Sequence, residues 1–183
     1  QALYETHKLT SYPRTDCPYL PESQHAEAPA VLAALVRVDP GLQVLVAAAN
    51  PALKSRVWNT AKVEASAHHA IVPTAAADIG KLSADERAIY DLIRRRYLAQ
   101  FFPAHEYDQT EVEAAVAGET FRASGRVERV AGWKAVLAPA AVATPAGRGR
   151  GTAHQGGDAD EDGSAEAQQA LPAMRAGELC RAE

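Results

Sequence analysis

The sequence predicts an α+β fold: a mostly helical part, then antiparallel strands, then a disordered acidic loop. Apolar residues recur at helical spacing after Pro29 and again after Ser83. Beyond Thr110 they alternate with polar residues, which is the period of a strand. From about residue 140 alanine, glycine and acidic residues dominate, and such a composition cannot bury enough apolar surface to order the chain.

Length and charge narrow the class of protein. The chain has 183 residues and begins at Gln1, with neither an initiator methionine nor a signal peptide, so we expect a segment of a longer protein. No apolar run approaches the roughly 20 residues that span a bilayer, and we expect no contact with membranes. The net charge of −4 is uneven, because residues 151–183 hold seven acids and two bases. Cys17 and Cys180 show no metal-ligand spacing and are expected as free thiols.

The first half of the chain predicts short helices separated by turns. Residues 2–8 have the pattern of a helix end, and residues 11–21, with three prolines, that of a loop. A helix is expected from near Pro29, which suits a first helical turn. A second short helix is expected over residues 42–49, and residues 54–73 look irregular or extended. The buried face of the first helix would carry Val31, Leu32, Leu35 and Val36.

The strongest helix signal follows Ser83. Ser83 and Glu86 have the spacing of a capping box, and Pro103 prevents the helix from continuing. Three arginines, Arg94 to Arg96, fall in the last turns, where positive charge suits the helix dipole. The expected buried face consists of Ile89, Leu92, Ile93, Tyr97 and Phe101.

Two or three antiparallel strands are expected next. Val112, Ala114 and Val116 alternate with polar residues before a turn at Gly118, and residues 121–130 look like a partner strand. Gly132 would turn the chain again into a further segment, Trp133 to Leu137. We expect a disordered loop over residues 140–170, and a further ordered element over residues 171–183.

The stretch "SYPRTD", residues 11–16, carries the most specific chemistry. Pro13 pushes Tyr12 towards an extended conformation, and residues two apart in an extended segment share a side, so Tyr12 and Arg14 would face one spot. A phenol is a weak nucleophile at neutral pH, but a guanidinium beside it favours the phenolate and can bind a phosphate. This design suits attack on a phosphodiester to give a covalent phosphotyrosine. A loop tyrosine near a surface arginine would give the same pattern.

Two other groups could bind or act on nucleic acid. In "SAHHAIVPT", residues 66–74, adjacent histidines cannot lie on one side of an extended segment, so one could face a site while the other packs. A metal site is not expected there, because no ligand cluster completes it. Arg94, Arg95 and Arg96 would by default be a solvated helix face, yet could contact a nucleic-acid backbone. Trp58 and Tyr19 could stack on bases or belong to the core.

Taken together, these stretches resemble the type IA DNA topoisomerases, most closely bacterial topoisomerase III. The resemblance rests on four motifs in family order: "LTSYPRTDCPYLPESQHAEAPAVLAAL" (9–35), "VWNTAKVEASAHHAIVPT" (57–74), "LSADERAIYDLIRRRYLAQFFP" (82–103) and "GETFRASGRVERVAGWKAVL" (118–137). Pro13 and the double histidine favour topoisomerase III over topoisomerase I.

The resemblance implies roles for individual residues. Tyr12 falls on the nucleophile that attacks a single DNA strand and keeps its 5′ phosphate. Arg14 falls on the arginine that helps to hold the scissile phosphate, and His68 on the first histidine of a motif near the same phosphate. The other residues implied to bind nucleic acid are Ser11, Thr15, Asp16 and His69, to which the arginine run adds Arg94 and Arg95.

The resemblance also implies an organisation into domains. Residues 1–102 would form a winged-helix-like DNA-cleavage domain that bears the tyrosine, and residues 103–139 would supply strands of a linking arch. Residues 140–170 would be the disordered low-complexity loop, and residues 171–183 would start an element of a further body domain. The whole enzyme would open at the tyrosine, pass a strand through the break and reseal it.

Cofactor and partners follow from the resemblance as well. The family binds Mg²⁺ through a toprim domain, and this chain contains no such domain, so we expect no metal site here and no relaxation of DNA by the chain alone. Expected partners are single-stranded DNA and the missing toprim and body domains. The parent would be a monomeric enzyme of the bacterial cytoplasm, associated with the nucleoid. A non-catalytic winged-helix-like module that binds single-stranded DNA is the alternative, and a purely structural piece of a larger assembly is a third.

Overall fold

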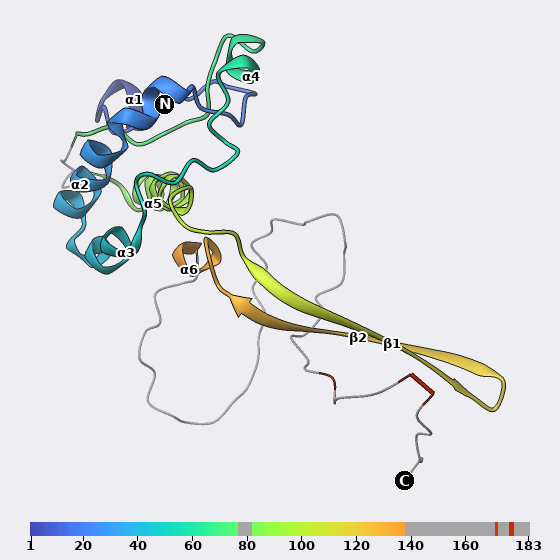
Figure 1. Ribbon diagram of the computed structural model, residues 1–183. Helices are drawn as coiled ribbons and strands as arrows, with labels where there is room; N and C mark the ends of the chain where they lie inside the picture. The colour runs from blue at the N-terminus through green and yellow to red at the C-terminus, as the bar shows by residue number, and fades with distance from the viewer. Residues whose placement is uncertain (77–81, 138–170, 172–175, 178–183) are drawn as a thin grey trace. The chain divides into compact units, whose positions relative to one another are not determined.

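The computed structural model describes residues 1–76, 82–137, 171, 176 and 177 (Figure 1). The described residues divide into two compact units. A helical unit contains residues 1–104 and 132–137, and the second unit includes residues 105–131. Helices and a two-stranded antiparallel sheet are both present, as the α+β prediction requires. The loop expected over residues 140–170 lies outside the described residues, as does most of the last expected element.

The helical unit is built from short elements around one long helix. In chain order they are α1 (Ala2–Glu5), the 3₁₀ helix η1 (Glu22–Glu27), α2 (Ala28–Val38), the 3₁₀ helix η2 (Pro40–Leu42), α3 (Gln43–Ala48), α4 (Thr60–Glu64), α5 (Ala84–Ala99) and α6 (Lys134–Leu137). Among the described residues, no helix is both long and apolar enough to cross a membrane.

The starts and ends of these helices follow local chemistry. Pro29 lies in the first turn of α2, and Asp39 ends the helix in an extended conformation while its carboxylate accepts a hydrogen bond from Gly41 N. The helix α4 corrects the prediction that residues 54–73 are irregular or extended. A side-chain cap starts it: Asn59 Oδ1 accepts a hydrogen bond from Lys62 N at 3.1 Å.

The capping box of α5 is confirmed, but its predicted buried face is partly wrong. Ser83 Oγ accepts from Glu86 N, and Ser83 N donates to the Glu86 carboxylate at 2.8 Å. Ile89 and Leu92 are 52% and 64% exposed. The residues that α5 buries are Tyr90, Arg94, Tyr97, Leu98 and Ala99.

The arginine run is not simply a solvated face. Arg94 is 7% exposed and bridges Asp91 to Asp39, with its Nη2 atom 2.7 Å from Asp39 Oδ2. Arg95 donates to Asp91 and to the carbonyl of Val136. The solvated interpretation is therefore wrong for Arg94, because its guanidinium links α5 to the end of α2.

The core of the helical unit has a main cluster and a smaller one. In the main cluster, Trp58, Tyr97 and Phe101 pack edge to face or tilted, with ring centres 5.2 to 6.5 Å apart. Trp58 is thus a core residue, which settles the choice left open by its sequence context. The smaller cluster consists of Leu3, Leu9 and Tyr90, and it ties α1 to α5.

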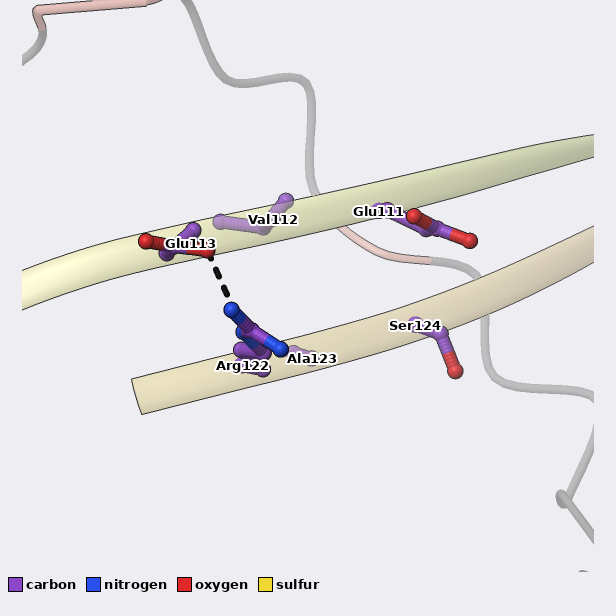
Figure 2. A pocket seen from close by; sticks show the side chains of 6 residues that line it. All are labelled: Glu111, Val112, Glu113, Arg122, Ala123 and Ser124. Atoms are coloured by element: carbon purple, nitrogen blue, oxygen red, sulfur yellow. Dashed lines mark hydrogen bonds and ion pairs between the residues drawn. The ribbon is translucent and has the colours of Figure 1, made fainter. Parts of the chain in front are cut away.

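The second unit contains a long antiparallel hairpin of β1 (Glu106–Val116) and β2 (Glu119–Val130) (Figure 1). Its two-residue turn is Ala117 and Gly118, both with positive φ, which is the backbone that such turns require. Most hairpin side chains are exposed, so cross-strand pairs contribute where a buried face would otherwise do so. Figure 2 shows Glu113 and Arg122 facing each other in a hollow on these strands. Arg122 Nε lies 3.1 Å from Glu113 Oε2.

The third candidate strand does not form. Trp133 N donates to the carbonyl of Pro103, and the next residues make the single helical turn α6. Val136 is fully buried in the main cluster. The segment therefore packs with the helices of the first unit, whereas the sequence grouped it with the strands.

Replacing Ser83 by alanine is expected to lower the free energy of unfolding by about 1 kcal/mol, because α5 loses its cap. The measurement is urea denaturation of the chain.

The backbone amide of Ser83 holds the pKa of Glu86 below its ordinary value of 4.5. The stability contributed by Glu86 is therefore present above pH 4.5 and is lost as the pH falls through the lowered pKa. For the substitution, Ser83→Thr keeps the hydroxyl and is the control. An equal loss of unfolding free energy in Ser83→Ala and Ser83→Thr would contradict the capping role.

Candidate functional site

The two most specific motifs of the sequence are joined by backbone hydrogen bonds. Thr10 and Pro73 form an antiparallel bridge. Beside it, Ser11 N donates to Val72 O at 2.9 Å, and Val72 N donates to Ser11 Oγ at 3.0 Å. Leu9 O accepts from Thr74 N at 3.0 Å. This pairing places the stretch that begins at Ser11 beside the stretch that follows the two histidines.

Tyr12 lies between two other rings. Its ring centre is 5.5 Å from that of Tyr4, at an interplanar angle of 82°, and 5.8 Å from that of His68, at 23°. Tyr12 is 47% exposed. The edge-to-face contact with Tyr4 and the stacking on His68 therefore restrict the ring of Tyr12, while the residue stays accessible to a ligand.

The loop around Tyr12 exposes every second side chain. Tyr12, Arg14 and Asp16 are exposed, whereas the residues between them are half-buried. Both Tyr12 and Arg14 are therefore accessible to a ligand, and that they face one spot stays a prediction. A guanidinium there can bind an anion that reaches the phenol.

The remaining residues of the motif fix the loop. Ser66 Oγ donates to Asp16 Oδ1 at 3.0 Å, and Thr15 Oγ1 accepts from Cys17 N at 3.0 Å. Cys17 is a free thiol, as expected for it, and is only 6% exposed. Asp16 and Thr15 thus help to fix the conformation of the loop through these hydrogen bonds.

The adjacent histidines have different surroundings. His68 is exposed and stacks on Tyr12. His69 is half-buried, with its Nδ1 atom 2.7 Å from Ala70 O and its Nε2 atom 3.1 Å from Gln24 Nε2. His68 therefore contacts Tyr12 at the candidate site, while His69 lies within hydrogen-bonding distance of Gln24 and Ala70. The sequence suggested this division between the two histidines.

Arg94 and Arg95 are engaged elsewhere, in the ion pairs with Asp91 and Asp39 described above. The structure brings neither of them into contact with Tyr12. Tyr19, the other residue considered for base stacking, has its hydroxyl 2.7 Å from Lys62 Nζ.

Tyr4 and Lys8 border the site and were missed by the sequence analysis. Lys8 has φ of 56°, and its ammonium lies 5.6 Å from the centre of the Tyr4 ring. Thr74 Oγ1 donates to the carbonyl of Lys8 at 2.6 Å, which holds this turn. No local pattern pointed to Tyr4, because its contact with Tyr12 depends on α1 packing against α5.

The side chains present do not fit a magnesium site. Within residues 1–76 and 82–137, no group of three or more histidine, cysteine, aspartate or glutamate residues is arranged to hold a metal ion. Asp16 already accepts the hydroxyl of Ser66.

A sequence model of the family described as DNA topoisomerase matches residues 1–169. The chain is 47% identical to DNA topoisomerase 3 of Pasteurella multocida over 137 residues, which cover 75% of this chain and 21% of that protein. This chain belongs to the type IA DNA topoisomerases.

Other relatives in this family are equally partial matches. DNA topoisomerase 3 of Vibrio cholerae is 45% identical over 135 residues, 73% of this chain and 21% of that protein. DNA topoisomerase 3 of Bacillus subtilis is 40% identical over 137 residues, 74% of this chain and 19% of that protein. The topoisomerase chain therefore spans about a fifth of the length of the curated relatives that it matches.

Tyr12 should be nitrated by tetranitromethane well before Tyr90 or Tyr97. The reagent attacks an accessible phenolate, and Tyr90 and Tyr97 are only 1% and 6% exposed. Burial also raises the pKa of Tyr97 to about 12 and raises the pKa of Tyr90. Mass spectrometry of peptides after brief treatment measures this order. Tyr12→Phe is the control for peptide assignment, and nitration of Tyr97 as fast as that of Tyr12 would contradict the arrangement.

Proposed function

We propose that this chain is the tyrosine-bearing part of a topoisomerase III that cleaves, passes and reseals a single DNA strand. The observation that supports the proposal is the position of Tyr12, which is exposed and stacked on His68, while Arg14 is exposed two residues further along the same loop. A nucleophile and a group able to carry a proton are thus neighbours, and Arg14 is close enough in sequence to supply a cation for the phosphate.

The reaction that fits this arrangement is a transesterification. The oxygen of Tyr12 forms a bond to the phosphorus of a phosphodiester, and the bond from phosphorus to the 3′ oxygen of the preceding nucleotide breaks. The phenol loses its proton, and the 3′ oxygen takes up a proton as it leaves. One phosphodiester is exchanged for another, so the free 3′ hydroxyl can reverse the reaction and reseal the strand.

Arg14 and His68 have distinct roles in this proposal. Arg14 binds the non-bridging oxygens of the scissile phosphate and offsets the charge that develops there. His68 lies against the ring of Tyr12 and can hold charge or transfer a proton at the leaving oxygen. Ser11, Thr15, Asp16 and His69 position the loop and border the strand. Arg94 and Arg95 are left out, because their guanidinium groups already serve the ion pairs of α5.

The rest of the enzyme lies outside this chain in our proposal. The helical unit corresponds to the winged-helix-like cleavage domain, and the hairpin to strands of the linking arch. A toprim domain would supply Mg²⁺ in the whole enzyme. We place the whole protein in the bacterial cytoplasm, at the nucleoid, as a monomer acting on single-stranded DNA.

Tyr12→Phe is expected to abolish covalent capture of DNA. The test uses the full-length enzyme carrying this sequence and a single-stranded oligonucleotide labelled at its 3′ end. After denaturation, label should remain on the parent protein, because the 5′ phosphate of the downstream fragment is bound to Tyr12. Phenylalanine keeps the ring contacts with Tyr4 and His68 but removes the attacking oxygen, so binding of the oligonucleotide should be unchanged.

Tyr107→Phe is the matched control, because Tyr107 is an exposed tyrosine of the hairpin. It should leave capture intact. Normal DNA binding without any labelled protein in the parent would overturn the proposal and favour the non-catalytic module that binds single-stranded DNA.

The chain alone is expected not to relax supercoiled plasmid, since half of the surroundings of the scissile phosphate would be missing. Gel electrophoresis after incubation with Mg²⁺ measures relaxation, with the full-length enzyme as positive control. Relaxation by the isolated chain that Tyr12→Phe removes would show that residues 1–183 suffice, contrary to this prediction.

A further inference from the structure

A hollow of about 440 Å³ lies in the helical unit, apart from the residues assigned to cleavage. Its size falls in the range of sites for small ligands. It is formed by the segment after α3, by the end of α5 with the residues that follow it, and by Trp133 and Leu137 on either side of the α6 turn. The residues that matter for its chemistry are Ser55, Arg56, Arg96, Gln100, Phe102 and Trp133.

The backbone of Trp133 is held in place at the edge of this hollow. Its backbone N–H donates to Pro103 O at 3.0 Å. Gly132 before it has φ of 52°, and a Cβ atom there would collide with the backbone of Ala104 and Pro103. Arg95 anchors the following turn through the carbonyl of Val136 at 2.9 Å. Trp133 is nevertheless 37% exposed, so an aromatic surface is available to a ligand.

The polar side of the hollow is positively charged. Arg56 and Arg96 line it, and none of its described lining residues is acidic. Ser55 Oγ donates to Gln100 Oε1 at 2.9 Å, while Gln100 Nε2 donates to Arg96 O at 3.1 Å, so this wall is ordered by its own hydrogen bonds. The hollow on the hairpin differs, because it contains Glu111 and Glu113 (Figure 2).

We propose that this hollow binds one nucleotide of a single DNA strand, with the base stacked on Trp133 and the phosphate bound by Arg56. An accessible indole beside Arg56, in a hollow whose described lining contains no acidic residue, suits an aromatic anion such as a nucleotide. Stacking accepts any base, which suits an enzyme that must hold strands of many sequences. The choice of DNA as the ligand rests on the proposed function, but the site does not depend on the chemistry at Tyr12.

The test uses the full-length enzyme carrying this sequence and Tyr12→Phe, so that binding is measured without cleavage. Oligothymidylate is titrated at several salt concentrations. Trp133→Ala is expected to weaken binding about tenfold through lost stacking. Arg56→Gln should reduce the slope of log affinity against log salt by about 0.7, the value for one phosphate contact. Arg37→Gln makes the same charge change at an exposed position of α2 outside the hollow, and should leave the slope unchanged.

Fluorescence separates a binding role from a structural one. Trp58 is 6% exposed, so the signal lost in Trp133→Phe belongs to the accessible indole, and oligothymidylate should quench it. Unchanged affinity in Trp133→Ala, or a salt slope for Arg56→Gln equal to that for Arg37→Gln, would overturn the inference. So would a Trp133 signal that acrylamide cannot quench, because another part of the same protein would then fill the hollow.

Failure here is distinguishable from failure of the proposed function. With Tyr12 restored, covalent capture of labelled DNA in Trp133→Ala at saturating DNA would uphold the cleavage role whatever the hollow binds. Quenching of Trp133 in a protein that never captures DNA would uphold the hollow alone.

Discussion

The antiparallel pairing of residues 9–11 with residues 72–74 is the constraint on which the candidate site depends. Neither stretch belongs to a regular element, and 61 positions separate Ser11 from Val72. Closing such a loop costs conformational entropy. Burial of Leu9 and Pro73, both less than 2% exposed, offsets that cost. The hydrogen bonds from Ser66 to Asp16 and from Ala70 N to Tyr19 O join the same two stretches on the other side of Tyr12 and His68.

The helices that support this pairing are held together by apolar contacts and one ionic bridge. Leu3 and Leu9 pack with Tyr90 and so join α1 to α5. On another part of α5, Arg94 reaches Asp39 at the end of α2. A buried guanidinium with two carboxylates adds specificity of position more than net stability, because desolvation of the charges opposes their attraction. The result is a scaffold in which short helices of modest intrinsic stability hold one geometry.

The hairpin follows different energetics from the helical unit. Its residues alternate as a strand should, yet neither face is buried among the described residues of its own unit. Tyr107, Val116, Phe121, Val127 and Val130 are all at least 37% exposed. An isolated two-stranded hairpin is marginal in water, and the cross-strand ion pair of Arg122 with Glu113 adds little stability, because both side chains are well exposed to solvent.

Features that depend on near neighbours could be predicted from the sequence: the cap at Ser83, the helix start near Pro29, the turn at Gly118 and the loop that contains Tyr12. Tertiary structure decided the rest. A helical pattern shows which side chains are apolar, but which face is buried depends on what packs there, so Leu92 is exposed while Arg94 is enclosed by partners from α2 and α5. Tyr4 borders Tyr12, and residues 134–137 form a helical turn, for the same reason: long-range packing supplies partners that local spacing does not contain.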